Sequence, residues 1–186
     1  MHIIPAPAAL RYRIEYDTMP ENPRTGIFEN LFTLYFSQNR YVSGDERIRE
    51  GHNQHDFEQS GAYLVFPVYA YIHSCVALSI NPFSCPWDSG QIGFAVISRA
   101  DLEKEYGWKR VSPQRWRKLE QYLKNELDEY TAYLNGEVYG YVIETEDGDE
   151  LESCWGFYDR AYCEQEAESL LAVMQAKENE RAQTAA

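Results

Sequence analysis

The sequence lacks the features that would direct it to a membrane or out of the cell. No stretch of its 186 residues approaches the roughly 18 consecutive apolar residues that a membrane-spanning helix requires. The first residues, MHIIPAP, contain no basic segment followed by an apolar one, so no secretion signal is apparent. We therefore expect a cytoplasmic protein that does not bind membranes.

Patterns typical of metals, phosphates and disulfide frameworks are also absent. The four cysteines, Cys75, Cys85, Cys154 and Cys163, include no C-x-x-C pair, which is the usual unit of a structural zinc site. The glycines form no phosphate-binding loop. We expect four reduced thiols, and neither a metal nor a cofactor.

Basic residues are scarce in the last third of the chain. Residues 119–186 contain 17 acidic and 4 basic side chains, whereas residues 1–118 contain 13 of each. The whole net charge of −13 therefore lies in the second segment. Nucleic-acid binding requires a basic stripe, so this balance disfavours nucleic acid as a direct ligand. A basic protein surface would instead be attracted.

Hydrophobic periodicity predicts an α+β fold. We expect an antiparallel sheet of about five or six strands that packs against two main helices, at 113–135 and 159–182. The first helix is predicted from apolar residues that recur at steps of three and four, namely Trp116, Leu119, Leu123, Leu127, Tyr130 and Leu134. Strands are expected at 11–18, 27–36, 64–72, 91–97, 137–144 and 150–155. We expect one domain spanning 1–186, in which 159–186 is a helical C-terminal extension with a frayed end.

The segment 82–91 admits two interpretations. His73, Cys85 and Asp88 are the residue types that a cysteine hydrolase uses as base, nucleophile and orienting acid. However, the segment lacks the glycine-flanked elbow that exposes a nucleophile. We favour a rigid structural loop, in which prolines restrict the backbone and the aromatic rings of Phe83 and Trp87 fill the core.

Two groups of side chains are weak candidates for metal binding. His52, His55 and Asp56 are close in sequence, but a third ligand at a defined spacing and the H-E-x-x-H pattern are missing. The carboxylates around the turn at 147–148 do not have EF-hand spacing. Exposed polar surface explains both groups better.

The acidic part of the chain is the predicted interaction surface. Its carboxylates would imitate the phosphates of nucleic acid only coarsely, because duplex DNA carries one charge per roughly 1.7 Å and successive helical turns are about 5.4 Å apart. Solubility is the alternative explanation of the same charge. The candidate partner-binding residues are Glu120, Glu126, Asp128, Glu129, Glu146, Asp147, Asp149, Glu150, Glu152, Glu164 and Glu168.

Three segments resemble a family of uncharacterised proteins from phages and other mobile elements. They are 67–74 (PVYAYIHS), 82–94 (PFSCPWDSGQIGF) and 153–158 (SCWGFY), and the shorter segments 22–24 and 40–45 are similar to the same family. The resemblance covers roughly residues 11–158 and departs at Cys75, where the family usually has glycine. No activity is established for the family, so the resemblance implies only a context. Small acidic proteins of mobile elements are often inhibitors of host defence.

We therefore expect an anti-defence inhibitor. Its acidic face would bind the basic, nucleic-acid-binding surface of a host effector, such as a CRISPR complex or a restriction enzyme. Two alternatives stay open: the small-substrate hydrolase built on His73, Cys85 and Asp88, and a regulatory module that binds another protein through exposed aromatic residues.

Overall fold

The computed structural model describes residues 9–25, 28–37 and 40–184, and its contacts divide the chain into two compact units. Unit 1 comprises Met1–Glu21 and Gly136–Ala186, and unit 2 comprises Asn22–Asn135. The expected α+β class is confirmed, but the strands form two sheets instead of one. The division also differs from the single domain that we expected. No described helix is both long and apolar enough to cross a membrane.

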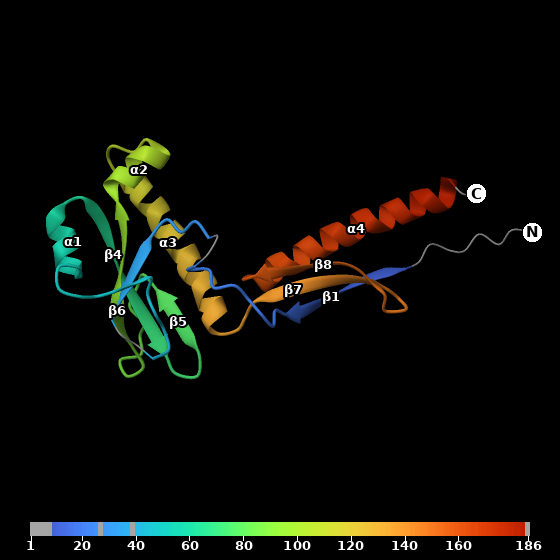
Figure 1. Ribbon diagram of the computed structural model, residues 1–186, viewed down its shortest axis with the longest axis horizontal. Helices are drawn as coiled ribbons and strands as arrows, with labels where there is room; N and C mark the ends of the chain where they lie inside the picture. Colours follow the sequence, from blue (N-terminus) through green and yellow to red (C-terminus); the bar gives the residue numbers. More distant parts are fainter. Residues whose placement is uncertain (1–8, 26–27, 38–39, 185–186) are drawn as a thin grey trace, which may run out of the picture. The chain divides into compact units, whose positions relative to one another are not determined.

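Unit 2 contains a five-stranded sheet in the order β3-β2-β6-β4-β5 (Figure 1). All neighbouring strands are antiparallel except β2 and β3, which are parallel. The short strands β3 and β5 form the edges of this sheet, and neither was predicted from the sequence. The strands are β2 (Thr33–Phe36), β3 (Glu46–Arg47), β4 (Tyr63–Ile72), β5 (Val76–Ser79) and β6 (Ser89–Ser98).

Helix α3 (Pro113–Leu134) supplies the main core of unit 2. The hydroxyl of Ser112 accepts a hydrogen bond from the Arg115 amide, and Pro113 occupies a first-turn position where no amide hydrogen is needed. The predicted apolar stripe is buried, with Leu119, Leu123, Leu127 and Tyr130 all packed in the same core cluster as alternate residues of β4. The predicted helix is therefore confirmed.

Two shorter helices complete unit 2. Helix α2 (Arg99–Tyr106) begins at its cap Ser98 and ends at Gly107, whose φ of 65° is accessible to glycine without strain. Helix α1 (Gln54–Ser60) lies on the opposite side of the sheet from α3 (Figure 1). Its Phe57 ring lies 4.9 Å from the Tyr63 ring and 5.7 Å from the Phe94 ring, centroid to centroid.

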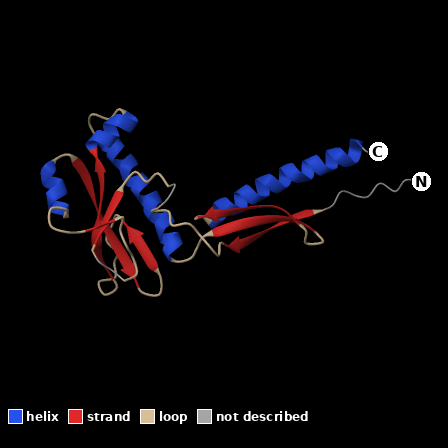
Figure 2. Ribbon diagram, in the orientation of Figure 1, coloured by secondary structure: helices blue, strands red, loops and turns tan. Residues whose placement is uncertain are grey.

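Unit 1 is a three-stranded antiparallel sheet covered by one helix. The strands β1 (Leu10–Tyr16), β7 (Tyr139–Thr145) and β8 (Glu150–Phe157) lie in the order β1-β7-β8. Helix α4 (Arg160–Thr184) runs along one face of this sheet (Figure 2). Its Cys163 and Ala167 are fully buried. The segment expected as a C-terminal extension is therefore an integral part of the core of unit 1.

The loop between β5 and β6 is held by its backbone and not by its tryptophan. The Ile72 amide donates to the Asp88 carbonyl at 2.8 Å, and the Ser89 hydroxyl donates to the Cys85 carbonyl. The side chain of Trp87 is 89% exposed, so the expectation that Trp87 fills the core is wrong. The indole points into solvent because the loop is satisfied by these local hydrogen bonds and needs no buried anchor.

Two substitutions test this assignment of the core. Leu123→Ala should lower the free energy of unfolding by about 2–5 kcal/mol, because it leaves a cavity at a fully buried position. Trp87→Ala should change it by no more than about 0.5 kcal/mol, because little packing is lost at an exposed position. Urea denaturation followed by circular dichroism measures both, and a larger effect at Trp87 would contradict the assignment.

Candidate functional site

Most of the net negative charge of the protein belongs to unit 1. That unit contains 16 acidic and 5 basic side chains, a net charge of −11. Unit 2 contains 14 acidic and 12 basic side chains, a net charge of −2. The asymmetry predicted along the sequence therefore becomes an asymmetry between two folded units.

The turn between β7 and β8 presents several exposed carboxylates. The turn is closed by hydrogen bonds from the Thr145 amide to the Asp149 carbonyl and from the Gly148 amide to the Thr145 carbonyl, each 3.0 Å long. Gly148 adopts a φ of 92°, which permits the tight reversal.

The side chains of Glu146 and Asp147 are exposed, as is that of Asp149. Within the described chain, no lysine or arginine forms an ion pair with any of these three. We call Glu146, Asp147, Asp149 and the nearby Glu152 the turn carboxylates.

A second set of carboxylates in unit 1 is neutralised within the sheet. Glu144 accepts hydrogen bonds from Arg11 at 2.7 Å and from Arg13 at 3.0 Å. These two guanidinium groups lower the pKa of Glu144 below its ordinary value, and the contact with Arg13 is the largest cause. Arg13 also pairs with Glu150 and Glu15. Glu150 is therefore exposed but already paired.

The candidate residues on α4 are also engaged locally. Glu164 pairs with Arg160 of the preceding turn at 2.9 Å. Glu168 accepts a hydrogen bond of 3.0 Å from the Tyr12 hydroxyl, and this bond raises the pKa of Tyr12. In contrast, Glu152 of β8 is exposed and has no cation within 4.0 Å among the described residues.

The remaining four candidates lie on α3 in unit 2, and one of them is not available to a partner. Glu126 has a side chain that is only 14% exposed and pairs with Arg24 at 2.7 Å, so its assignment to the interaction surface is a mistake. Glu120 is half-buried and accepts a hydrogen bond from the Trp116 indole. Asp128 and Glu129 are exposed, although partial desolvation raises the pKa of both carboxyl groups.

Glu126 is part of a structural network centred on Arg24. The Arg24 side chain, which is 4% exposed, bonds to both Asp45 and Glu126 and to the carbonyl of Phe32 at 2.7 Å. The other oxygen of Glu126 accepts the Leu31 amide at 2.7 Å. Burial raises the pKa of Glu126, against the opposing effect of Arg24. The network ties Arg24 and Leu31 to α3 and explains why this carboxylate points inward.

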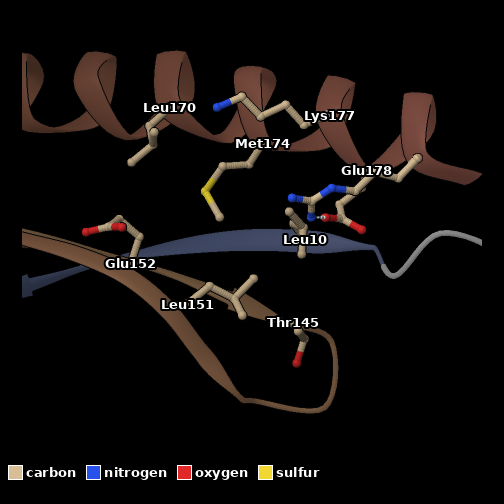
Figure 3. A pocket seen from close by; sticks show the side chains of 9 residues that line it. Leu10, Thr145, Leu151, Glu152, Leu170, Met174, Lys177 and Glu178 are labelled. Carbon is tan, nitrogen blue, oxygen red and sulfur yellow. Dashed lines mark hydrogen bonds and ion pairs between the residues drawn. The ribbon is translucent and has the colours of Figure 1, made fainter.

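A pocket of about 460 Å³ adjoins the turn carboxylates in unit 1 (Figure 3). Leu10 and Leu151 enter it from the sheet, and Leu170 and Met174 enter it from α4. Glu152 lies at its edge. The charged groups at the α4 side are Lys177, Glu178 and Arg181, of which the last two form an ion pair of 2.6 Å. The pocket therefore combines an apolar floor with a carboxylate that has no cation partner.

The structure brings together only part of the hydrolase constellation. Cys85 Sγ lies 3.8 Å from Asp88 Oδ2. His73 is exposed, and within the described chain its imidazole hydrogen-bonds to neither of them. A thiol nucleophile needs a base within hydrogen-bonding reach, so this arrangement does not favour cysteine catalysis. Among the described residues, no three His, Cys, Asp or Glu side chains are placed to hold a metal ion.

Sequence reasoning missed a compact group of cations in unit 2. Residues 107–119 contain five basic side chains and no acidic one. The equal counts over residues 1–118 concealed this cluster, because the acidic side chains that balance it lie elsewhere. A sliding charge window of about a dozen residues would have revealed it.

Comparisons with known proteins assign no function. The chain matches no protein-family model, no curated protein and no solved structure.

The Glu144 network predicts how stability depends on pH. Because Arg13 and Arg11 lower the pKa of Glu144 in the folded state, its ionised form stabilises unit 1, and this stabilisation is lost as pH falls below the ordinary value of 4.5. Glu144→Gln should therefore lower the melting temperature at pH 7 but have progressively less effect below pH 4.5. The control is Glu146→Gln, at an exposed carboxylate without an ion pair. A Glu144→Gln deficit that stays constant from neutral to acidic pH would refute the role of the network.

Proposed function

We propose that the protein is an inhibitor that uses unit 1 to occupy the basic, nucleic-acid-binding surface of another protein. The observation that carries the proposal is the net charge of −11 on unit 1 against −2 on unit 2. In keeping with the resemblance to mobile-element proteins, the proposed partner is a host defence effector, such as a CRISPR complex or a restriction enzyme.

The distribution of charge favours this function over solubility alone. Surfaces that serve only solubility usually mix charges of both signs, and the 14 acidic and 12 basic side chains of unit 2 follow that pattern. Unit 1 departs from it. Its few cations are largely used inside the unit, since Arg11 and Arg13 bind Glu144 and Arg160 binds Glu164. The turn carboxylates are left to attract external cations.

The spacing of these carboxylates suits a surface that binds a phosphate backbone. Alternate residues of a strand are about 6.6 Å apart, and side chains on successive helical turns are about 5.4 Å apart. These intervals match the phosphates of a duplex only coarsely. However, arginine and lysine side chains are long and flexible, so a basic channel can adjust to them.

The pocket beside Glu152 offers an anchor point for such a partner. An arginine or lysine has an apolar stem and a charged head. Its stem would lie on Leu151 and Met174, and its head would reach Glu152. Arginine is enriched among the residues that dominate interface energetics, so one inserted arginine would fix the register of the complex.

Charge reversal in the turn tests the proposal. The double variant Asp147→Lys with Asp149→Lys should weaken binding to a partner purified from host lysate by about tenfold or more, because it replaces attraction by repulsion. The matched control is Glu46→Lys with Glu50→Lys, which reverses two exposed carboxylates of unit 2. Biolayer interferometry measures the dissociation constant of each.

The wild-type complex should also weaken as salt is raised, and duplex DNA should compete with it. Binding that is insensitive to salt, with both double variants as active as the wild type, would contradict the proposal. Contact would then be made by neutral surfaces, and the acidic unit would serve solubility.

A further inference from the structure

Unit 2 contains a small pocket next to its cluster of cations. The pocket has a volume of about 290 Å³ and lies between residues 28–31 and the helices α2 and α3. Its lining includes Tyr106 at the end of α2, Tyr122, Asn125, Glu126 and Glu129 on α3, and Glu29. This volume is at the lower limit of ligand pockets, which span roughly 300–1,000 Å³, so it suits a single ring system.

Aromatic rings continue from the pocket onto the surface. The Tyr106 ring lies 5.1 Å from the Trp108 ring, with an interplanar angle of 36°. Tyr106 is 41% exposed, although aromatic side chains usually pack inside. Exposed aromatic faces are the platforms on which proteins stack the bases of single-stranded nucleic acids.

The cations beside these rings are held by aromatic faces and not by carboxylates. The Lys118 ammonium lies 5.3 Å from the centre of the Tyr122 ring and 5.9 Å from that of Trp108. The Arg115 guanidinium lies 5.0 Å from the centre of the Trp108 ring. Among the described residues, neither Arg115 nor Lys118 forms an ion pair with a carboxylate, although Arg115 also donates a hydrogen bond of 2.7 Å to the Arg110 carbonyl. The positive charges of Arg115 and Lys118 are therefore preorganised and left available to an anion.

The polar groups inside the pocket favour a hydrogen-bond donor, whereas the cations outside it favour an anion. The carboxylates of Glu129 and Glu29 supply hydrogen-bond acceptors there, whereas Asn125 Oδ1 already accepts a hydrogen bond from Gln121 at 2.8 Å and the charge of Glu126 is balanced by Arg24. The carboxylates of Glu29 and Glu129 repel phosphate but accept hydrogen bonds from the amino groups of bases, as Glu and Asp do from cytosine N4. Hydrogen-bond acceptors line the pocket, and cations lie beside it. This arrangement suits a ligand in which a ring with an amino group is attached to a phosphate.

We propose that unit 2 binds a nucleotide whose base carries an exocyclic amino group. The base enters the pocket between Tyr106 and Tyr122, and the phosphate is bound by Arg115 and Lys118. The nucleotide is either free or part of a single strand. The net charge of the whole chain disfavours nucleic acid, but unit 2 alone carries only −2.

The test uses the full chain and two fluorescein-labelled probes, a ten-nucleotide strand of deoxycytidine and one of thymidine. Fluorescence anisotropy at 0.1 M salt should show that the cytidine strand binds about fivefold or more tightly, since thymine lacks the amino group. Unlabelled dCMP is the competitor. Displacement by dCMP at the same concentration of nucleotide identifies a free nucleotide as the ligand, and displacement only by the strand identifies single-stranded nucleic acid.

Three variants locate the site. Arg115→Glu with Lys118→Glu should weaken both probes by about tenfold or more, whereas the matched control Arg47→Glu with Arg49→Glu should not. Tyr106→Ala should weaken both by about fivefold through lost stacking. Glu129→Leu should reduce the preference for cytidine over thymidine and leave thymidine binding unchanged or tighter.

The proposal is overturned if neither probe binds, if the two strands bind equally, or if Tyr106→Ala has no effect. It is also overturned if the control pair weakens binding as much as the test pair. An unchanged unfolding transition for each variant excludes misfolding as the cause of a loss. None of these outcomes depends on unit 1, so the test is independent of the proposed inhibitory function.

Discussion

The antiparallel pairing of β1 with β7 is the interaction on which the organisation of this protein depends. It joins Leu10–Tyr16 to Tyr139–Thr145 and so closes unit 1 from the two ends of the chain. Residues 22–135 are thereby left as a separate unit with its own sheet and core. The same pairing places Arg11 and Arg13 against Glu144. A unit with 16 acidic side chains therefore obtains two of its five cations from the first strand.

This pairing also determines which carboxylates remain available. Like charges at high density oppose a compact state, and the first strand relieves that repulsion in the sheet, where Glu144 is buried and Glu150 lies beside it. Among the described residues, no cation pairs with Glu146 or Asp147 in the turn between β7 and β8. An external basic surface would lower the electrostatic energy of unit 1, and the proposed function follows from that difference.

Local patterns predicted the longer elements, whereas non-local contacts determined the short edge strands and the assembly of the two sheets. The 3–4 spacing of Leu119, Leu123 and Leu127 was enough to predict α3 and its buried face, because helix periodicity is a property of adjacent turns. The two sheets were not predictable, since nothing within residues 10–16 specifies β7 as their partner. Glu126 was misplaced for the same reason: its partner Arg24 is 102 residues away. The cation cluster at 107–119 was readable but was concealed by averaging over too long a segment.

The central claim is that unit 1 contacts the partner through its acidic turn. Amide hydrogen exchange of the full chain, measured with and without the purified host partner, tests this claim most directly, because exchange reports protection residue by residue. The account predicts that binding slows exchange in 144–152 and in the part of α4 that lines the adjoining pocket. Slower exchange confined to residues 22–135, with the turn unchanged, would contradict it.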